Sequence, residues 1–197
     1  PRLRAHPATQ LSRPQLTMST SDTTRTVPID FDHPPDDPVT WLHDWLEEAR
    51  SLTELPNPNA MALATVDEQG QPAVRIVLLK QFVERGVVFY TNYNSRKAHD
   101  IAVNPRVAVS MHWDPLDRQV RAEGTIEKIS AARSDAYYHT RPRLSRIGAH
   151  ASLQSRPLAS REELEARVKA LEEQYAEDDD LPRPDDWGGY EITFHRM

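Results

Sequence analysis

The 197-residue sequence contains no cysteine and no long apolar run. Without cysteine the chain can form no disulfide, use no thiolate nucleophile and offer no sulfur ligand to zinc or to an iron–sulfur cluster. No apolar stretch approaches the roughly 18 residues that a transmembrane helix requires, and the start lacks the apolar core of a secretory signal. The sequence therefore predicts a cytoplasmic protein without membrane contact, whose chemistry comes from other side chains or from a bound cofactor.

Metal-binding spacing is also missing. The eight histidines include no HExxH or comparable pattern, and scattered histidines are more often surface or polar core residues than metal ligands. No metal site is predicted.

Positive charge is scarce in the chain as a whole but concentrated in its middle. Lys and Arg number 24 against 30 Asp and Glu, giving a net charge of −6, yet between residues 75 and 156 there are 14 Lys and Arg against 7 Asp and Glu. Arg offers a planar fork and Lys a point charge for charge-assisted hydrogen bonds to phosphate. The positive middle therefore predicts an anion site. Nucleic acid is not the predicted partner, because the chain is acidic overall and its aromatic residues lack the RNP pattern.

Composition divides the chain into two parts. Residues 1–36 are rich in Pro, Ser, Thr, Arg and Asp and show little apolar periodicity, which predicts a disordered N-terminal arm. Met18 is a candidate for the natural start. Residues 37–197 are long enough for one domain with a sizeable core.

Periodicity within residues 37–197 predicts helices between strands. Helical spacing follows Asp37-Pro38, a typical N-cap and first helical residue, and Ser95 and Ser160 are further candidate N-caps. Helices are predicted over 38–49, 96–103, 130–140, 144–152 and 161–177. Strands are predicted over 60–66, 73–79, 87–92, 107–113, 119–129 and 187–194. Short connections between strands favour antiparallel pairing, so we expect an α+β domain built around a small, mostly antiparallel β-barrel with flanking helices.

Side chains suited to phosphate fall into four clusters, at 75–85, 95–97, 117–121 and 137–155. Each cluster alone has an ordinary structural interpretation. Arg118 and Arg121 could be surface charges, Tyr137 and Tyr138 could be core aromatics, and the SRK segment at 95–97 could be a capped helix start. Their combination carries the prediction.

Taken in order, these segments resemble those of a known family. The segments are RIVLLK, FYTNYNSRK, NPRVAVSMHW, RQVR, YYHTRPRLSRIGAHASLQS and WGGY, and the family is that of the pyridoxine/pyridoxamine 5′-phosphate oxidases. The resemblance extends from about residue 38 to Tyr190, and its most specific part is RPxxSxIGAxxSxQS at 141–155 together with WGG at 187–189. It implies the FMN-binding split-barrel fold over residues 37–197.

The resemblance also implies a role for each matching residue. The FMN site would comprise Arg75, Ile76, Val77, Leu78, Leu79, Lys80, Tyr90, Thr91, Arg96, Lys97, Gln119, Gln154, Ser155 and Trp187. The substrate phosphate would be held by Lys80, Tyr137, Arg141 and Ser145. Two phosphates need two sets of basic and hydroxyl donors, and the sequence supplies two. In this family the sets come from different subunits, which implies a homodimer with shared active sites.

The implied reaction moves a hydride equivalent from C4′ of pyridoxine or pyridoxamine 5′-phosphate to the flavin and yields pyridoxal 5′-phosphate. O2 then reoxidises the flavin and gives H2O2. Because the flavin performs the difficult chemistry, the protein has to orient the substrate ring and fix both phosphates. No residue is predicted to act as a catalytic base.

The sequence departs from the family pattern after WGG. Family members continue into an RxHDR-like segment whose Arg and His contact the substrate, and residues 191–197 contain no such segment, so weaker substrate binding is expected. Two alternatives stay open. One is a related split-barrel flavin oxidase acting on another ring, such as a phenazine precursor; the other is a protein that binds FMN or pyridoxal 5′-phosphate without turnover.

Overall fold

The computed structural model describes residue 30, residues 32–176 and residues 181–197. Most of the predicted N-terminal arm, including the candidate start Met18, lies outside the described residues. Within the described part, no helix is both long and apolar enough to cross a bilayer.

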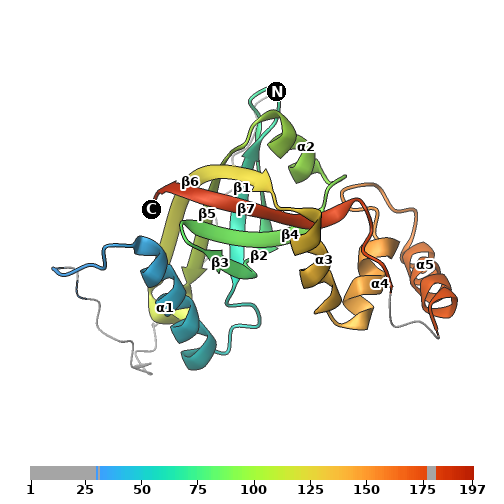
Figure 1. Ribbon diagram of the computed structural model, residues 1–197, viewed down its shortest axis with the longest axis horizontal. Coiled ribbons are helices and arrows are strands. Elements are labelled where there is room, and N and C mark those ends of the chain that lie inside the picture. The colour runs from blue at the N-terminus through green and yellow to red at the C-terminus, as the bar shows by residue number, and fades with distance from the viewer. Residues whose placement is uncertain (1–29, 31, 177–180) are drawn as a thin grey trace, which may run out of the picture.

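Among the described residues, seven strands form one sheet in the order β2-β1-β5-β6-β7-β4-β3, and every neighbouring pair is antiparallel (Figure 1). The strands are β1 (Ala60–Val66), β2 (Pro72–Leu78), β3 (Gln81–Val83), β4 (Gly86–Asn92), β5 (Arg106–Trp113), β6 (Arg118–Lys128) and β7 (Trp187–Arg196). The predicted α+β, mostly antiparallel fold is confirmed. The three-residue strand β3 was not predicted, because it is too short to show an alternating pattern.

The sheet curls into an open barrel because of how its edges are connected. β2 and β3 lie at opposite edges of the sheet, yet only Leu79 and Lys80 separate them in sequence. The N–H of Lys80 donates to the carbonyl of Val88 in β4 at 2.9 Å, so the two edges approach each other across this short link. Residues of β2 and β4 are therefore brought close to each other.

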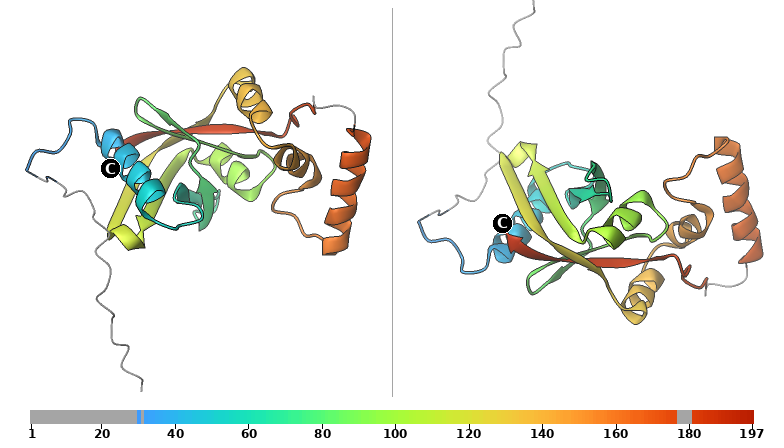
Figure 2. Two further views of the ribbon diagram at one scale, coloured as in Figure 1. Left: turned by 90° about the horizontal axis from the view of Figure 1, so that it is seen from below. Right: turned by 90° about the horizontal axis from the view of Figure 1, so that it is seen from above.

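In the part of the chain that the structure describes, five α-helices flank the barrel. They are α1 (Pro38–Leu52), α2 (Arg96–Val103), α3 (Ala131–His139), α4 (Arg143–Ala151) and α5 (Arg161–Gln174), and a 3-10 turn spans Asp114–Leu116. α1 lies toward one end of the molecule, and α3, α4 and α5 gather at the other (Figures 1 and 2). As predicted, Asp37 caps α1 by accepting a hydrogen bond from the N–H of Val39 at 3.0 Å.

The barrel interior is filled by the inward-facing half of each alternating strand. In β5 the buried residues are Val107, Val109, Met111 and Trp113. Leu42 and Leu46 of α1 close one end of this core, since they are 2% and 0% exposed. Burying such side chains stabilises the fold by about 1.5–3 kcal/mol each relative to exposure.

Two details of the helices differ from expectation. Ser95 occupies the N-cap position of α2, but its hydroxyl makes no cap hydrogen bond and accepts one from Lys97 Nζ instead. The helix predicted to reach Glu177 ends at Gln174, and Glu177 lies outside the described residues.

Arg118 is not a surface charge. Its side chain is 3% exposed, pairs with Glu48 of α1 and lies with its guanidinium carbon 5.0 Å from the ring centre of Trp45. This contact fastens α1 to the start of β6, and the interpretation of Arg118 as a surface charge is wrong.

Candidate functional site

A cavity of about 470 Å³ lies where α3 and α4 meet the sheet. It brings together residues from strands, helices and loops that are far apart in the sequence. The predicted residues that line it are Ile76, Val77, Leu78, Lys80, Tyr90, Thr91, Lys97, Tyr137, Arg141, Ser145, Gln154 and Trp187. Both predicted phosphate-binding sets therefore contribute to a single cavity of one chain, whereas the resemblance implied that the two sets come from different subunits.

The other predicted residues lie outside this cavity, and their roles stay predictions. Arg75 turns inward toward Asp100, and Leu79 is a core residue with 1% exposure. The side chain of Arg96 is 57% exposed and lies 3.8 Å from Asp67. Gln119 lines a second cavity on the outer face of the sheet, and Ser155 follows Gln154 in a left-handed conformation with φ 66°.

Lys97 is a buried cation whose hydrogen-bond partners among the described residues are all uncharged. It is 7% exposed, and its Nζ donates to Thr91 Oγ1 at 3.0 Å, Ser95 Oγ at 3.1 Å and Gln154 Oε1 at 2.6 Å. Burial, with a smaller contribution from Arg75, lowers the pKa of Lys97 to about 8. Because its three hydrogen-bond partners are neutral oxygens, a ligand phosphate would stabilise the charged form.

Two other residues that line the same cavity also carry buried polar atoms. Arg141 Nη1 and Tyr90 Oη are buried and have no hydrogen-bond partner among the described residues. Leaving such a group unpaired costs about 1–3 kcal/mol, so each is a position where a ligand atom is expected. Burial raises the pKa of Tyr90 to about 12, so its hydroxyl keeps its proton at neutral pH. Burial lowers the pKa of Arg141, and a ligand anion would stabilise its charged form.

Three aromatic rings form one wall of the cavity. The ring centres of Tyr90 and Tyr137 are 3.7 Å apart, and the ring centre of Trp187 lies 5.4 Å from that of Tyr90. The planes are nearly parallel, with angles of 12° in both pairs. Arg141 places its guanidinium carbon 4.5 Å from the centre of the Trp187 ring. Flat walls with a cation beside them suit a planar ring that carries an anionic group.

The WGG motif explains how Trp187 reaches this wall. A Cβ on Gly189 would lie 2.5 Å from Ile129 Cδ1 and 2.9 Å from Tyr90 Cε1, and one on Gly188 would lie 2.2 Å from the hydroxyl oxygen of Tyr93. Only glycine allows these approaches, so both positions are needed for the packing of β7 against β4 and α3.

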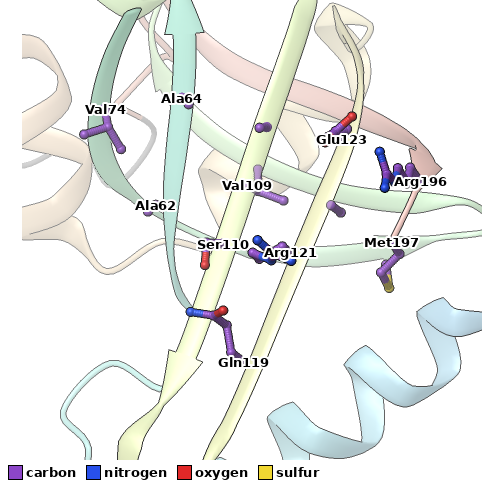
Figure 3. A pocket seen from close by; sticks show the side chains of 12 residues that line it. Ala62, Ala64, Val74, Val109, Ser110, Gln119, Arg121, Glu123, Arg196 and Met197 are labelled. Carbon is purple, nitrogen blue, oxygen red and sulfur yellow. The ribbon is translucent and has the colours of Figure 1, made fainter.

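The larger cavity, of about 690 Å³, lies on the outer face of β1, β2, β5 and β6. Figure 3 shows Gln119 and Arg121 of β6 beside Ser110 of β5 in this cavity, with Ala62 and Ala64 on β1. It has fewer clustered basic donors than the cavity at α3 and α4. The smaller cavity is therefore the better candidate for binding a phosphate.

Three residues close to the predicted ones were not expected from the sequence. Thr140 and Pro142 line the main cavity, and Asn92 lines an adjoining space of about 300 Å³ that shares Arg141 and Trp187 with it. Each directly follows or precedes a predicted residue in the chain, and that adjacency was the only available signal.

Comparison with known proteins gives a consistent result. The family model described as pyridoxamine 5′-phosphate oxidase matches residues 46–175. A pyridoxine/pyridoxamine 5′-phosphate oxidase from Bordetella petrii is 52% identical over 156 residues, which cover 79% of this chain and 72% of the relative. The oxidase from Thermosynechococcus vestitus is 53% identical over 157 residues, which cover 80% of this chain and 73% of the relative.

Solved structures show the same fold. PhzG from Burkholderia lata 383, solved in complex with tetrahydrophenazine-1-carboxylic acid, is 27% identical, with a TM-score of 0.79 over 87% of this chain and 83% of that one. A pyridoxamine 5′-phosphate oxidase-related, FMN-binding protein from Nostoc punctiforme PCC 73102 has a TM-score of 0.62 at 19% identity, over 87% of this chain and 82% of that one. The split-barrel fold expected from the sequence is confirmed.

Proposed function

The chain belongs to the pyridoxamine 5′-phosphate oxidase family, and from that premise we propose that it oxidises pyridoxine or pyridoxamine 5′-phosphate to pyridoxal 5′-phosphate, with FMN as cofactor and O2 as electron acceptor. The observation that carries the proposal is the meeting of Lys97, Arg141 and the aromatic wall in one cavity. The curated relatives at 52% and 53% identity carry the name of this activity over about four fifths of the chain.

The chain's own groups fit a flavin phosphate. Lys97 is buried without an anionic hydrogen-bond partner, and Thr91 and Ser95 place hydroxyls within hydrogen-bond distance of its Nζ. These three residues would hold the FMN phosphate, while the nearby charge of Arg75 is balanced by its ion pair with Asp100. When bound, FMN supplies the two-electron chemistry; the protein supplies no redox group of its own.

Four residues would hold the phosphate of the substrate. Lys80, Tyr137, Arg141 and Ser145 line the same cavity, and burial, followed by repulsion from Arg141, lowers the pKa of Lys80. Two cations that repel each other in a partly dry space favour a dianion between them. With its phosphate fixed there, the pyridine ring would be oriented by the aromatic wall, so catalysis depends on positioning more than on a base.

We further propose a homodimer with shared sites. On β2, Val74 and Ile76 are 69% and 64% exposed, while Arg75 between them turns inward. Exposed β-branched side chains beside the alanine-lined outer cavity are typical of an interface. Gln119 lies on this face and does not line the cavity of its own chain, so in the proposed two-fold pairing it would serve the flavin site of the partner subunit.

Two measurements on the purified protein test the function. Anaerobic addition of pyridoxamine 5′-phosphate should bleach the flavin absorbance, and in air pyridoxal 5′-phosphate and H2O2 should form in equal amounts. Flavin that binds but is never reduced would instead indicate a binding protein. Reduction by a dihydrophenazine carboxylate but not by either B6 phosphate would favour a PhzG-like activity.

A further inference from the structure

An arginine outside the cavity ties two of its walls together. Arg183 lies in the segment that leads into β7, and its side chain is 11% exposed. Its Nε donates to Asp135 Oδ1 at 2.6 Å, and its Nη1 donates to the carbonyls of Pro184 at 3.1 Å and Trp187 at 2.5 Å. No local sequence pattern predicts a role for Arg183 or Asp135.

The positions of these partners connect the arginine to the site. Asp135 lies on α3 two residues before Tyr137, and the Trp187 carbonyl belongs to the residue whose ring is part of the aromatic wall. The rings of Tyr137 and Trp187 are nearly parallel, at 7°, with centres 6.4 Å apart. One planar guanidinium therefore spans from the helix that carries Tyr137 to the backbone that carries Trp187.

We infer that Arg183 is a positioning residue that sets the spacing of Tyr137 and Trp187 and thereby the affinity for the phosphorylated pyridine ring; this inference rests on the proposed function. The geometry requires arginine. Its rigid fork bonds a carboxylate with one nitrogen and two carbonyls with another, whereas the single ammonium of lysine cannot fix the same relative orientation.

A second link between α3 and β7 provides a matched control. Arg133 of α3 pairs with Glu191 of β7 at 2.7 Å, and its side chain is 46% exposed. Neither Arg133 nor Glu191 lines the cavity. Arg133→Gln therefore removes an ion pair between the same two elements but leaves the hydrogen bond to the Trp187 carbonyl in place. It shows how much of any effect comes from weaker packing of α3 on β7 alone.

The experiment compares Arg183→Gln, Arg183→Lys and Arg133→Gln as FMN-loaded proteins. For each we would measure the Kd of pyridoxal 5′-phosphate by equilibrium dialysis, KM and kcat for pyridoxine 5′-phosphate, and the melting temperature. A displacement of about 1 Å in a positioned site can cost up to roughly a hundredfold. We expect Arg183→Gln to raise Kd and KM by about ten- to a hundredfold, Arg183→Lys to recover only part of this, and Arg133→Gln to stay within about twofold of wild type.

A double variant tests the route of the effect. If Arg183 acts through Tyr137, Arg183→Gln should cost less affinity in a Tyr137→Phe background than in wild type, because coupled residues are not additive. Full additivity, or equal Kd values for Arg183→Gln and Arg133→Gln, would overturn the inference. If Arg183→Gln fails to fold, Asp135→Asn is the test, because it removes the ion pair between Arg183 and α3 but leaves both backbone hydrogen bonds of Arg183 in place. An unchanged Kd for pyridoxal 5′-phosphate in Asp135→Asn would refute the positioning role of Arg183. Wild-type protein that binds no pyridoxal 5′-phosphate would refute the proposed function instead.

Discussion

The guanidinium of Arg75 lies 3.4 Å from Oδ2 of Asp100, on the inward side of a strand whose neighbouring residues Val74 and Ile76 face outward. The Thr65 hydroxyl joins the pair: it donates to Asp100 at 2.5 Å and accepts from Arg75 Nη1 at 2.7 Å. Asp100 is 4% exposed, so it supplies a buried negative charge on the α2 side of the site. The positive charge of Arg75, which lies near Lys97, is thus balanced by the negative charge of Asp100.

Asp100→Asn should destabilise the ligand-free protein by about 2 kcal/mol. Breaking a fully buried ion pair costs more, and the value is reduced here because Arg75 is one-fifth exposed. Since the FMN phosphate would replace the lost negative charge, the difference from wild type should shrink when FMN is saturating. Chemical unfolding with and without FMN measures both values. An equal loss in the two conditions would show that the phosphate binds elsewhere.

Lys97→Met should weaken FMN binding by about one to two decades, because a hydrogen bond to a charged group contributes roughly 1.5–3 kcal/mol. Riboflavin, which lacks the phosphate, is the control and should bind nearly as before. Arg96→Ala should act in the same direction by a smaller factor, since the Arg96 side chain is more than half exposed and screened by solvent. Fluorescence titration of both flavins measures these affinities; equal losses for FMN and riboflavin in Lys97→Met would rule out a phosphate contact.

FMN affinity should fall as the pH rises above about 8. Burial lowers the pKa of Lys97 to about 8, so the cation that attracts the phosphate is progressively lost above that value. In the ligand-free protein the sign is opposite. The unfolded state keeps this proton up to the usual 10.5, so between the two values it holds more protons and the free energy of unfolding rises with pH. Both trends should disappear in Lys97→Met, and riboflavin affinity should stay flat from pH 7 to 9.

The strands were predicted well where polar and apolar residues alternate clearly along the sequence. The inward or outward direction of a side chain was not predicted where it depends on a distant partner residue. The predicted strand 107–113 became β5 at Arg106–Trp113. Alternation in β2 correctly places Arg75 on the opposite face from Val74 and Ile76. It cannot show that the charged residue takes the inward face, because that depends on Asp100, which lies 25 residues away.

The sequence predicted which residues form the site but not how those residues are arranged in space. The string at 141–155 identified Arg141, Ser145 and Gln154, and all three line the cavity. The roles of Arg183 and Asp135 come from a contact across 48 residues, which no local pattern encodes. Long-range partners of this kind are fixed by the packing of α3 on β7.

Gly189→Ala should destabilise the protein by about 1–3 kcal/mol, because the added methyl would overpack against Ile129 and the Tyr90 ring. The displaced Tyr90 should also loosen its stacking on Tyr137, so near-ultraviolet circular dichroism should change. Gly148→Ala is the matched control: it lies within α4 with no atom within 4 Å of the new methyl, and it should stabilise by about 0.5–1 kcal/mol. Similar melting temperatures for the two variants would mean that β7 can shift to accept the methyl.

Val74→Lys combined with Ile76→Lys should convert a dimer to a monomer. The two side chains are 69% and 64% exposed on one face of β2, and lysines there would place like charges opposite each other across a two-fold axis. Light scattering at micromolar concentration with FMN present measures the change in mass. Because Ile76 itself lines the cavity and its replacement by lysine would disturb FMN directly, the shared site is tested separately by Gln119→Ala in the wild-type dimer, which should weaken FMN binding. A wild-type protein that is monomeric and still binds FMN tightly would refute the shared site.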